Sequence, residues 1–212
     1  MNIYKKWIVF LFGILIMSFG AVLLSKTALG VAPWEAVNFG LSYTIGLTPG
    51  TWIIILSFLS LIIASLLEKK FIKFSSFITA LLIGSFIDLW MFLLDFIVLE
   101  TMLIRCIIFI VAILFSSIGI AIYLYPKLPT NPIDYLMLVI KNKFNLKLMH
   151  AKLLIDISLL VLAVIFKGPI GLGTIILTLF IGPSINFWQS ILDKYLKTFI
   201  NSEDCSKLSK SS

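Results

Sequence analysis

Residues 7–25 read WIVFLFGILIMSFGAVLLS and contain no charged side chain. A helix needs roughly 20 predominantly apolar residues to cross the hydrocarbon core of a bilayer, so this run is long enough to span it. A second uncharged run, residues 168–192, is longer still. Both runs are continuous rather than alternating, which favours helices over the strands of a β-barrel. They predict an all-α membrane protein in contact with a lipid bilayer.

The composition excludes most soluble classes. Hydrophobic residues make up 60% of the 212 residues and charged residues only 13%, with a mean hydropathy of +1.12. Soluble domains carry about 25% charged residues. The net charge of +7 comes from lysines that flank apolar runs, which indicates membrane topology and no nucleic acid partner.

The sequence offers no set of residues for metal or hydrolytic chemistry. The two cysteines, Cys106 and Cys205, have no zinc or disulfide spacing, and His150 is the single histidine. A Ser-His-Asp set and a phosphate-binding loop are both missing from the pattern. We therefore expect no enzymatic activity, no cofactor and no metal site.

Six spans and two shorter helices are predicted. The first run is read as a retained helix rather than a signal peptide, because it is long and no clear cleavage site follows it. The short helices begin at prolines and are too short to span comfortably. The predicted spans are 7–25, 51–67, 74–96, 102–125, 151–167 and 170–191, and the short helices are 33–46 and 132–145.

Six crossings with both termini in the cytoplasm give a strong positive-inside bias. Only Lys26, Arg105 and Lys167 then lie outside. If both short helices also crossed, the bias would weaken, because Lys69, Lys70, Lys73 and Lys127 would move outside. The lysines placed inside are 5, 6, 69, 70, 73, 127, 141, 143, 147, 152, 194, 197, 207 and 210.

The two halves of the chain resemble each other at an offset of 99 residues, which becomes 98 near the end of each half. This offset predicts a first repeat at 1–98, a second at 99–192, and a polar cytoplasmic tail at 193–212. Because each repeat has three crossings, the second copy is inverted in the membrane, an architecture recurrent in secondary transporters. The matched pairs include Gly20 with Gly119, Pro33 with Pro132, Gly84 with Gly182, and Trp90 with Trp188.

The starts of the short helices are the first candidate site. Each has a proline at its first position, which suits a residue without an N–H, and a carboxylate at its third. The carboxylates either offset the helix dipole or line a substrate cavity. Asn131 is expected to cap the second short helix. The candidates here are Pro33, Trp34, Glu35, Asn131, Pro132 and Asp134, with Asn38 on the same polar stripe as Glu35 and Ser42.

Polar residues inside the spans are the second candidate site. Asp88 lies well inside the third span, and its repeat counterpart is Asn186. Charged residues at that depth are costly and are candidates for function. The alternative is a structural ion pair between Asp88 and Arg105. An ion pair between Lys152 and Asp156, one helical turn apart, is also predicted.

Two motifs resemble the YczE/YyaS/YitT-type bacterial membrane proteins. The motifs are ALGVAPWEAV at 28–37 and ALLIGSFIDL at 80–89, and GLGT at 171–174 is close to a further element of that family. The family commonly has Pro-Arg-Asp in its second half, whereas this chain has Pro132-Ile133-Asp134. The resemblance implies a multi-pass protein of the bacterial cytoplasmic membrane with no cofactor and no settled substrate.

Two functional hypotheses follow. The inverted repeat, the paired short helices and the polar pair Asp88 and Asn186 favour a secondary transporter, or a membrane substrate-binding component, for a small solute. The alternative is a non-transporting membrane partner that stabilises or regulates another protein or complex. A protein partner or a second copy of the chain is compatible with either hypothesis.

Overall fold

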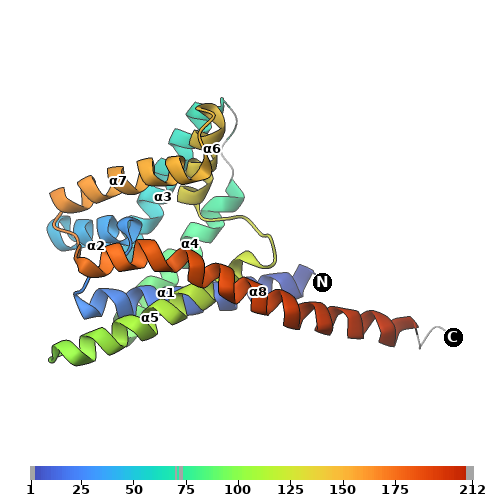
Figure 1. Cartoon of the computed structure of the whole chain (residues 1–212). Helices are drawn as coiled ribbons and strands as arrows, with labels where there is room; N and C mark the ends of the chain where they lie inside the picture. Colours follow the sequence, from blue (N-terminus) through green and yellow to red (C-terminus); the bar gives the residue numbers. More distant parts are fainter. Residues whose placement is uncertain (1–2, 70, 72–73, 209–212) are drawn as a thin grey trace.

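The computed structural model describes residues 3–69, 71 and 74–208, and every regular element in them is a helix (Figure 1). Lys70, Lys73 and Lys210, which contributed to the predicted topology, lie outside the described residues. The elements are α1 (Ile3–Thr27), α2 (Pro33–Ile45), α3 (Pro49–Glu68), α4 (Phe74–Leu93), α5 (Met102–Leu124), α6 (Pro132–Lys143), α7 (Leu148–Ile165) and α8 (Leu172–Leu208).

The predicted all-α membrane fold is confirmed. Six described helices are long and apolar enough to cross a membrane, namely α1, α3, α4, α5, α7 and the first part of α8, Leu172–Lys194. Their ends lie within about one helical turn of the six predicted spans. Helix α8 continues to Leu208 through Pro183, so the segment predicted as a polar tail begins as helix, and α8 changes direction part-way along (Figure 1).

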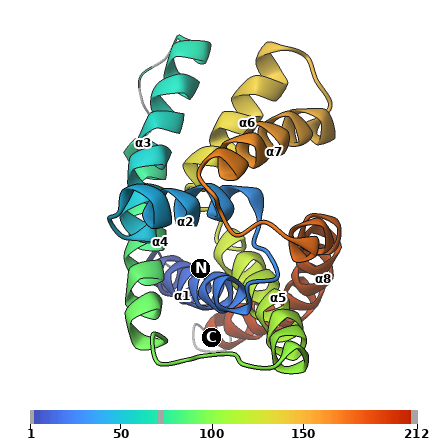
Figure 2. The same cartoon turned by 90° about the vertical axis from the view of Figure 1, so that its left-hand side faces the viewer.

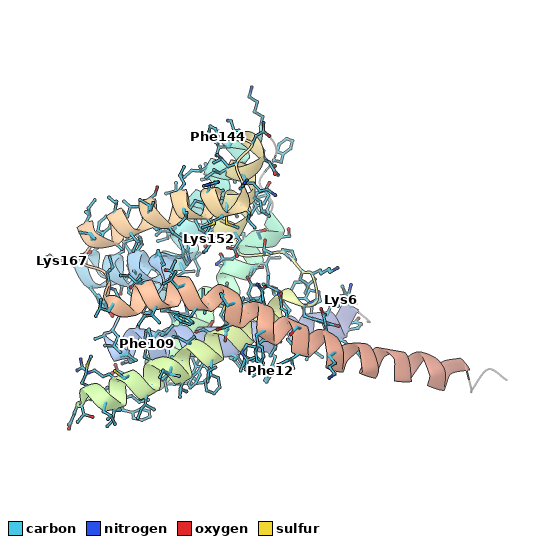
Figure 3. All side chains as sticks on the ribbon, viewed as in Figure 1. Lys6, Phe12, Phe109, Phe144, Lys152 and Lys167 are labelled. Carbon is cyan, nitrogen blue, oxygen red and sulfur yellow. The ribbon has the colours of Figure 1, made fainter. Side chains whose placement is uncertain are left out.

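The outside of the bundle is apolar. Large hydrophobic side chains such as Phe12, Ile110 and Leu179 are more than half exposed, and side chains of this kind cover the bundle surface (Figure 3). Soluble proteins rarely leave a continuous apolar surface exposed, whereas lipid tails solvate one. The helical bundle is therefore a membrane protein.

Helices α1 and α5 pack closely against each other, and glycines bring their backbones together. A Cβ atom added at Gly20 would lie 2.9 Å from the carbonyl oxygen of Ala112, and one added at Gly119 would lie 2.6 Å from the Cα of Met17. Small residues allow membrane helices to approach this closely, so that van der Waals contact replaces the missing hydrophobic drive.

Each short helix packs against a span of the other half of the chain. Helix α2 packs along α7, and α6 packs along α3 (Figure 2). Helix α2 lies inside the bundle rather than on its surface, since eight of its 13 residues are buried. The two halves are thus interlocked through their short helices.

The helix starts follow the repeat spacing. The helices of the first half begin at residues 3, 33, 49 and 74, and those of the second half begin at 102, 132, 148 and 172. These starts differ by 99, 99, 99 and 98 residues, which is the offset of the sequence matches. Inversion of the second repeat in a membrane stays a prediction.

The two halves differ in one packing contact. Helix α3 packs along α4. In the second half α7 corresponds to α3 and α8 to α4, but α7 and α8 make no comparable contact in the described residues. In the predicted topology Lys167 lies outside and Lys6 lies inside. Figure 3 shows these two lysines at opposite ends of the bundle. Which end faces the cytoplasm stays a prediction.

Candidate functional site

Glu35 reaches a cavity inside the bundle. Ala32 is extended, Pro33 starts α2 at its first position as predicted, and Glu35 follows at the third. The cavity has a volume of about 70 Å³, enough for a few water molecules or a compact solute group. Its walls come from α1, α2, α5 and α8, so both halves contribute. The lining residues are Met17, Ala21, Leu24, Val31, Ala32, Glu35, Ser116, Ile120, Leu177 and Ile181.

Ser116 is the second polar group of the cavity. Its side chain is only 5% exposed, and its hydroxyl has no hydrogen-bond partner. Buried hydroxyls in membrane helices usually bond to a carbonyl of their own helix, as the Ser117 hydroxyl does to Leu114 at 3.0 Å. The Ser116 hydroxyl packs against Gly20 of α1 and is left without a partner.

Further unpartnered polar atoms lie on the short helices. The indole N–H of Trp34 is buried and donates to nothing within the described residues. Asn38 is fully buried, and its amide donates to the Trp34 carbonyl at 2.7 Å while its side-chain oxygen stays free. Each unpaired buried group costs free energy unless water or a ligand satisfies it. Trp34 and Asn38 share α2 with Glu35, but they are not among the residues that line the cavity.

Glu35 and Asp134 lie on the short helices, outside the six spans, and both carboxyl groups are shifted towards the neutral form. Burial raises the pKa of Glu35 to about 7, against the lowering effects of its own backbone amide and of Lys152. Burial raises the pKa of Asp134 to about 6, again opposed by Lys152. Asp156 raises both. The two carboxyl groups therefore share one electrostatic environment with α7.

The predicted ion pair on α7 is present. The Lys152 ammonium lies 3.3 Å from a carboxylate oxygen of Asp156, one helical turn away. Sequence reasoning treated this pair as local and did not connect it with Glu35 or Asp134. The connection arises because α2 and α6 both pack against α7.

The second short helix starts at Pro132 as predicted, but the expected cap is wrong. Asn131 occupies the cap position, yet its side chain makes no capping hydrogen bond. Its side-chain oxygen is buried without a partner, while its backbone carbonyl accepts from the amides of Asp134 and Tyr135. The Asn131 side-chain oxygen is therefore a buried acceptor without a partner.

Asp88 is a structural link between α4 and the start of α3. It accepts hydrogen bonds from the Thr48 hydroxyl at 2.6 Å and from the Gly50 amide at 2.8 Å. The predicted alternative of a pair with Arg105 is wrong, because the Arg105 guanidinium donates to the Leu99 carbonyl at 2.9 Å. The free amides at the start of α3 attract the carboxylate more directly than a cation on another helix does.

Asn186 lies apart from the cavity. It is exposed on α8, and its side chain makes no hydrogen bond within the described part of the chain. Asp88 and Asn186, which the sequence predicted as a polar pair, therefore differ in the structure. The Asp88 side chain is hydrogen-bonded to the start of α3, whereas the Asn186 side chain has no hydrogen bond among the described residues.

Ser116 was missed by sequence reasoning. Its only signal was the pair Ser116-Ser117 within an apolar span, and serines are common in membrane helices because they bond back to the helix. Among the described residues no group of three or more His, Cys, Asp or Glu side chains is placed to hold a metal ion.

The chain matches, over residues 4–190, a family described as a family of unknown function (DUF6198). It is 36% identical over 191 residues to the uncharacterized protein YyaS of Bacillus subtilis, covering 90% of this chain and 95% of that one. It is 31% identical over 183 residues to the uncharacterized membrane protein YczE of the same organism, covering 86% and 84% of the two chains. An uncharacterized protein of Haemophilus influenzae is 24% identical over 189 residues, 89% of this chain and 85% of that one. No solved structure matches the chain significantly.

Proposed function

The chain belongs to the YczE/YyaS-type membrane proteins of unknown function (DUF6198), and we propose that it is a secondary transporter, or a substrate-binding component, for a small solute. One observation carries the proposal. Glu35 and Ser116 both line a cavity inside the bundle, and the Ser116 hydroxyl has no partner. Burial of a carboxyl group and of an unpaired hydroxyl costs free energy, and a bound solute would offset that cost.

The position of the cavity supports the proposal. Its walls come from a short helix of the first half and from spans of both halves. Transporters built from two inverted repeats bind their substrates between the repeats, beside short or broken helices. Inversion of the second repeat and a cytoplasmic location of both termini, in a bacterial cell membrane, are part of the proposal. We propose no catalytic activity.

The chemistry of the lining favours a small solute with a protonated amine. Glu35 offers a carboxylate, and Ser116 offers a hydroxyl that accepts or donates. The other eight lining residues are apolar. An ammonium group with a short apolar body matches one carboxylate in apolar surroundings, whereas an anion would face a like charge.

A second, larger hollow, lined in part by Lys6, Lys127 and Asp193, is a weaker candidate for the solute site. It has a volume of about 470 Å³ and lies beside the N-terminal part of α1 and the end of α5. Its polar groups, including Lys6, Lys127 and Asp193, are of the kind that faces water at the end of a bundle. Of the described residues that line it, none has a buried polar atom without a partner.

The test is thermal unfolding of the purified protein in detergent with a panel of small amines, together with alcohols and carboxylates of matched size. A ligand of the folded state raises the unfolding temperature by mass action. We expect an amine to stabilise the protein, Glu35→Gln to abolish the effect and Ser116→Ala to weaken it. Ser158→Ala is the matched control, because that hydroxyl is exposed and bonded to the Leu154 carbonyl.

Two results would contradict the proposal. One is a panel in which no compound stabilises the unmodified protein more than it stabilises Glu35→Gln. The other is specific co-purification of a membrane protein complex without stabilisation by any solute, which would favour the alternative of a non-transporting partner.

A further inference from the structure

The start of α3 and the middle of α4 meet backbone to backbone. Gly50 faces Gly84 so closely that a Cβ atom at Gly84 would lie 2.6 Å from the Gly50 carbonyl oxygen. The Asp88 carboxylate, one turn further along α4, bonds to Thr48 and to the Gly50 amide. The contact closes the space between α3 and α4.

The counterpart of this contact in the second half is open. At the repeat offset, Gly84 corresponds to Gly182, Asp88 to Asn186, and Thr48 to Lys147. A Cβ atom at Gly182 would meet nothing within 4 Å. Asn186 is exposed, and α8 makes no packing contact with α7 comparable to that between α4 and α3.

No packing contact in this arrangement therefore requires a glycine at position 182. Glycine inside a helix is unfavourable relative to alanine, and Gly84 shows what offsets that cost, namely close approach of a second backbone. Pro183 beside it removes a helical hydrogen bond, so α8 can bend at this point. A glycine facing open space next to a bend fits a contact that forms in another arrangement.

We propose that the two halves exchange this contact, so that α8 closes onto the start of α7 through Gly182 and Asn186 while α4 separates from the start of α3. The inference rests on the proposed transport function and deepens it. Because the starts of α3 and α7 would lie at opposite faces of the membrane in the predicted topology, the exchange opens the Glu35 cavity to one face and closes it to the other. The structure then has the α3–α4 side closed.

The hollow of about 470 Å³ agrees with the open side. It is lined by Gln189 and Asp193 of α8, which follow Asn186 along the helix, and by the end of α5. Both belong to the end of the bundle that the start of α7 would approach in the predicted topology. Closure of α8 would reshape this hollow and leave the α1–α5 contact unchanged.

Cysteine cross-linking in membranes, without any solute, tests the exchange. The native Cys106 and Cys205 are first replaced by serine. The pair Thr48→Cys with Asp88→Cys reports the closed α3–α4 contact, and its repeat counterpart, Lys147→Cys with Asn186→Cys, reports the proposed α7–α8 contact. Disulfide formation is measured by mass spectrometry of the digested protein.

We expect both pairs to cross-link. The control for random collision is Lys147→Cys with Ile175→Cys, since Ile175 lies near the start of α8. This control pair should cross-link at least tenfold less than Lys147→Cys with Asn186→Cys. Gly182→Leu should fold normally, since the site is open, and should abolish the Lys147–Asn186 cross-link while leaving the Thr48–Asp88 cross-link unchanged.

Cross-linking of Lys147→Cys with Asn186→Cys at the control level would overturn the inference. So would a Lys147–Asn186 cross-link that Gly182→Leu does not reduce. Because no solute is present, these results are independent of the thermal-shift test of Glu35, and a failure of the exchange can be told from a failure of the proposed function.

Discussion

Replacement of Asp88 by asparagine tests whether its carboxylate holds α4 against the start of α3. The substitution keeps the shape of the side chain and removes its charge. Both hydrogen bonds that Asp88 accepts are short, 2.6 Å from the Thr48 hydroxyl and 2.8 Å from the Gly50 amide. Only the charge and the number of accepting oxygens change, so the effect reports the link itself.

The size of the effect follows from the two bonds. A hydrogen bond to a charged group contributes roughly 1.5–3 kcal/mol and a neutral one roughly 0.5–1.5 kcal/mol, so two weakened bonds amount to about 2–3 kcal/mol. Asp88 is partly exposed, which places the expectation at the lower end, about 2 kcal/mol. Thr48→Val removes one of the two bonds, and the two changes together should cost about 1 kcal/mol less than their sum, because they share one interaction.

The assay is reversible unfolding in mixed micelles with a rising fraction of SDS, followed by tryptophan fluorescence. Asn186→Ala is the matched control, because the repeat counterpart of Asp88 has no hydrogen bond to lose, and its effect should stay within about 0.5 kcal/mol. The reasoning is refuted if Asp88→Asn unfolds with the free energy of the unmodified protein. It is equally refuted if Asn186→Ala costs as much as Asp88→Asn.

Three further predictions concern other contacts. Gly84→Leu should prevent folding, because its Cβ would meet the Gly50 carbonyl oxygen, whereas Gly182→Leu should keep the folded yield of the unmodified protein in size-exclusion chromatography. The raised pKa of Glu35 means that the folded state binds its proton more tightly than the unfolded state, so the contribution of Glu35 to stability is greatest below about pH 4.5 and is lost as the pH rises through about 7; in pH-dependent unfolding experiments Glu35→Gln should remove this contribution and leave that of Asp134, whose pKa is raised to about 6. Tyr135→Phe removes the 2.8 Å hydrogen bond to Glu68 that joins α6 to the end of α3, and should lower the free energy of unfolding by roughly 1 kcal/mol in the same micelle assay.

The spans and short helices could be predicted because their signals are local. Uncharged runs such as 7–25 and 168–192 are long enough to decide a span without knowledge of neighbours. Prolines at 33 and 132 mark helix starts for a reason that resides in their own ring. The 99-residue offset was also readable, since glycine, proline and tryptophan matches are rare by chance in an apolar chain.

The side-chain partners could not be predicted, because they depend on how the helices are rotated about their axes. Depth along a span suggested Arg105 as a partner for Asp88, but the Asp88 side of α4 turns towards Thr48. For Asn131 the cap position was right and the side-chain direction wrong. Ser116 became visible only when α1, α2, α5 and α8 enclosed a cavity around it.

The packing of each short helix against a span of the other half also constrains how the protein is synthesised and folded. Helix α2 leaves the ribosome long before α7, the span that covers it, and most of its residues are buried in the finished bundle. The first half of a nascent chain therefore carries an uncovered, partly polar helix until more than a hundred further residues have been translated. A half-length fragment ending near residue 98 should accordingly be a substrate for membrane quality-control proteases, and co-expression of residues 99–212 from a second transcript should protect it.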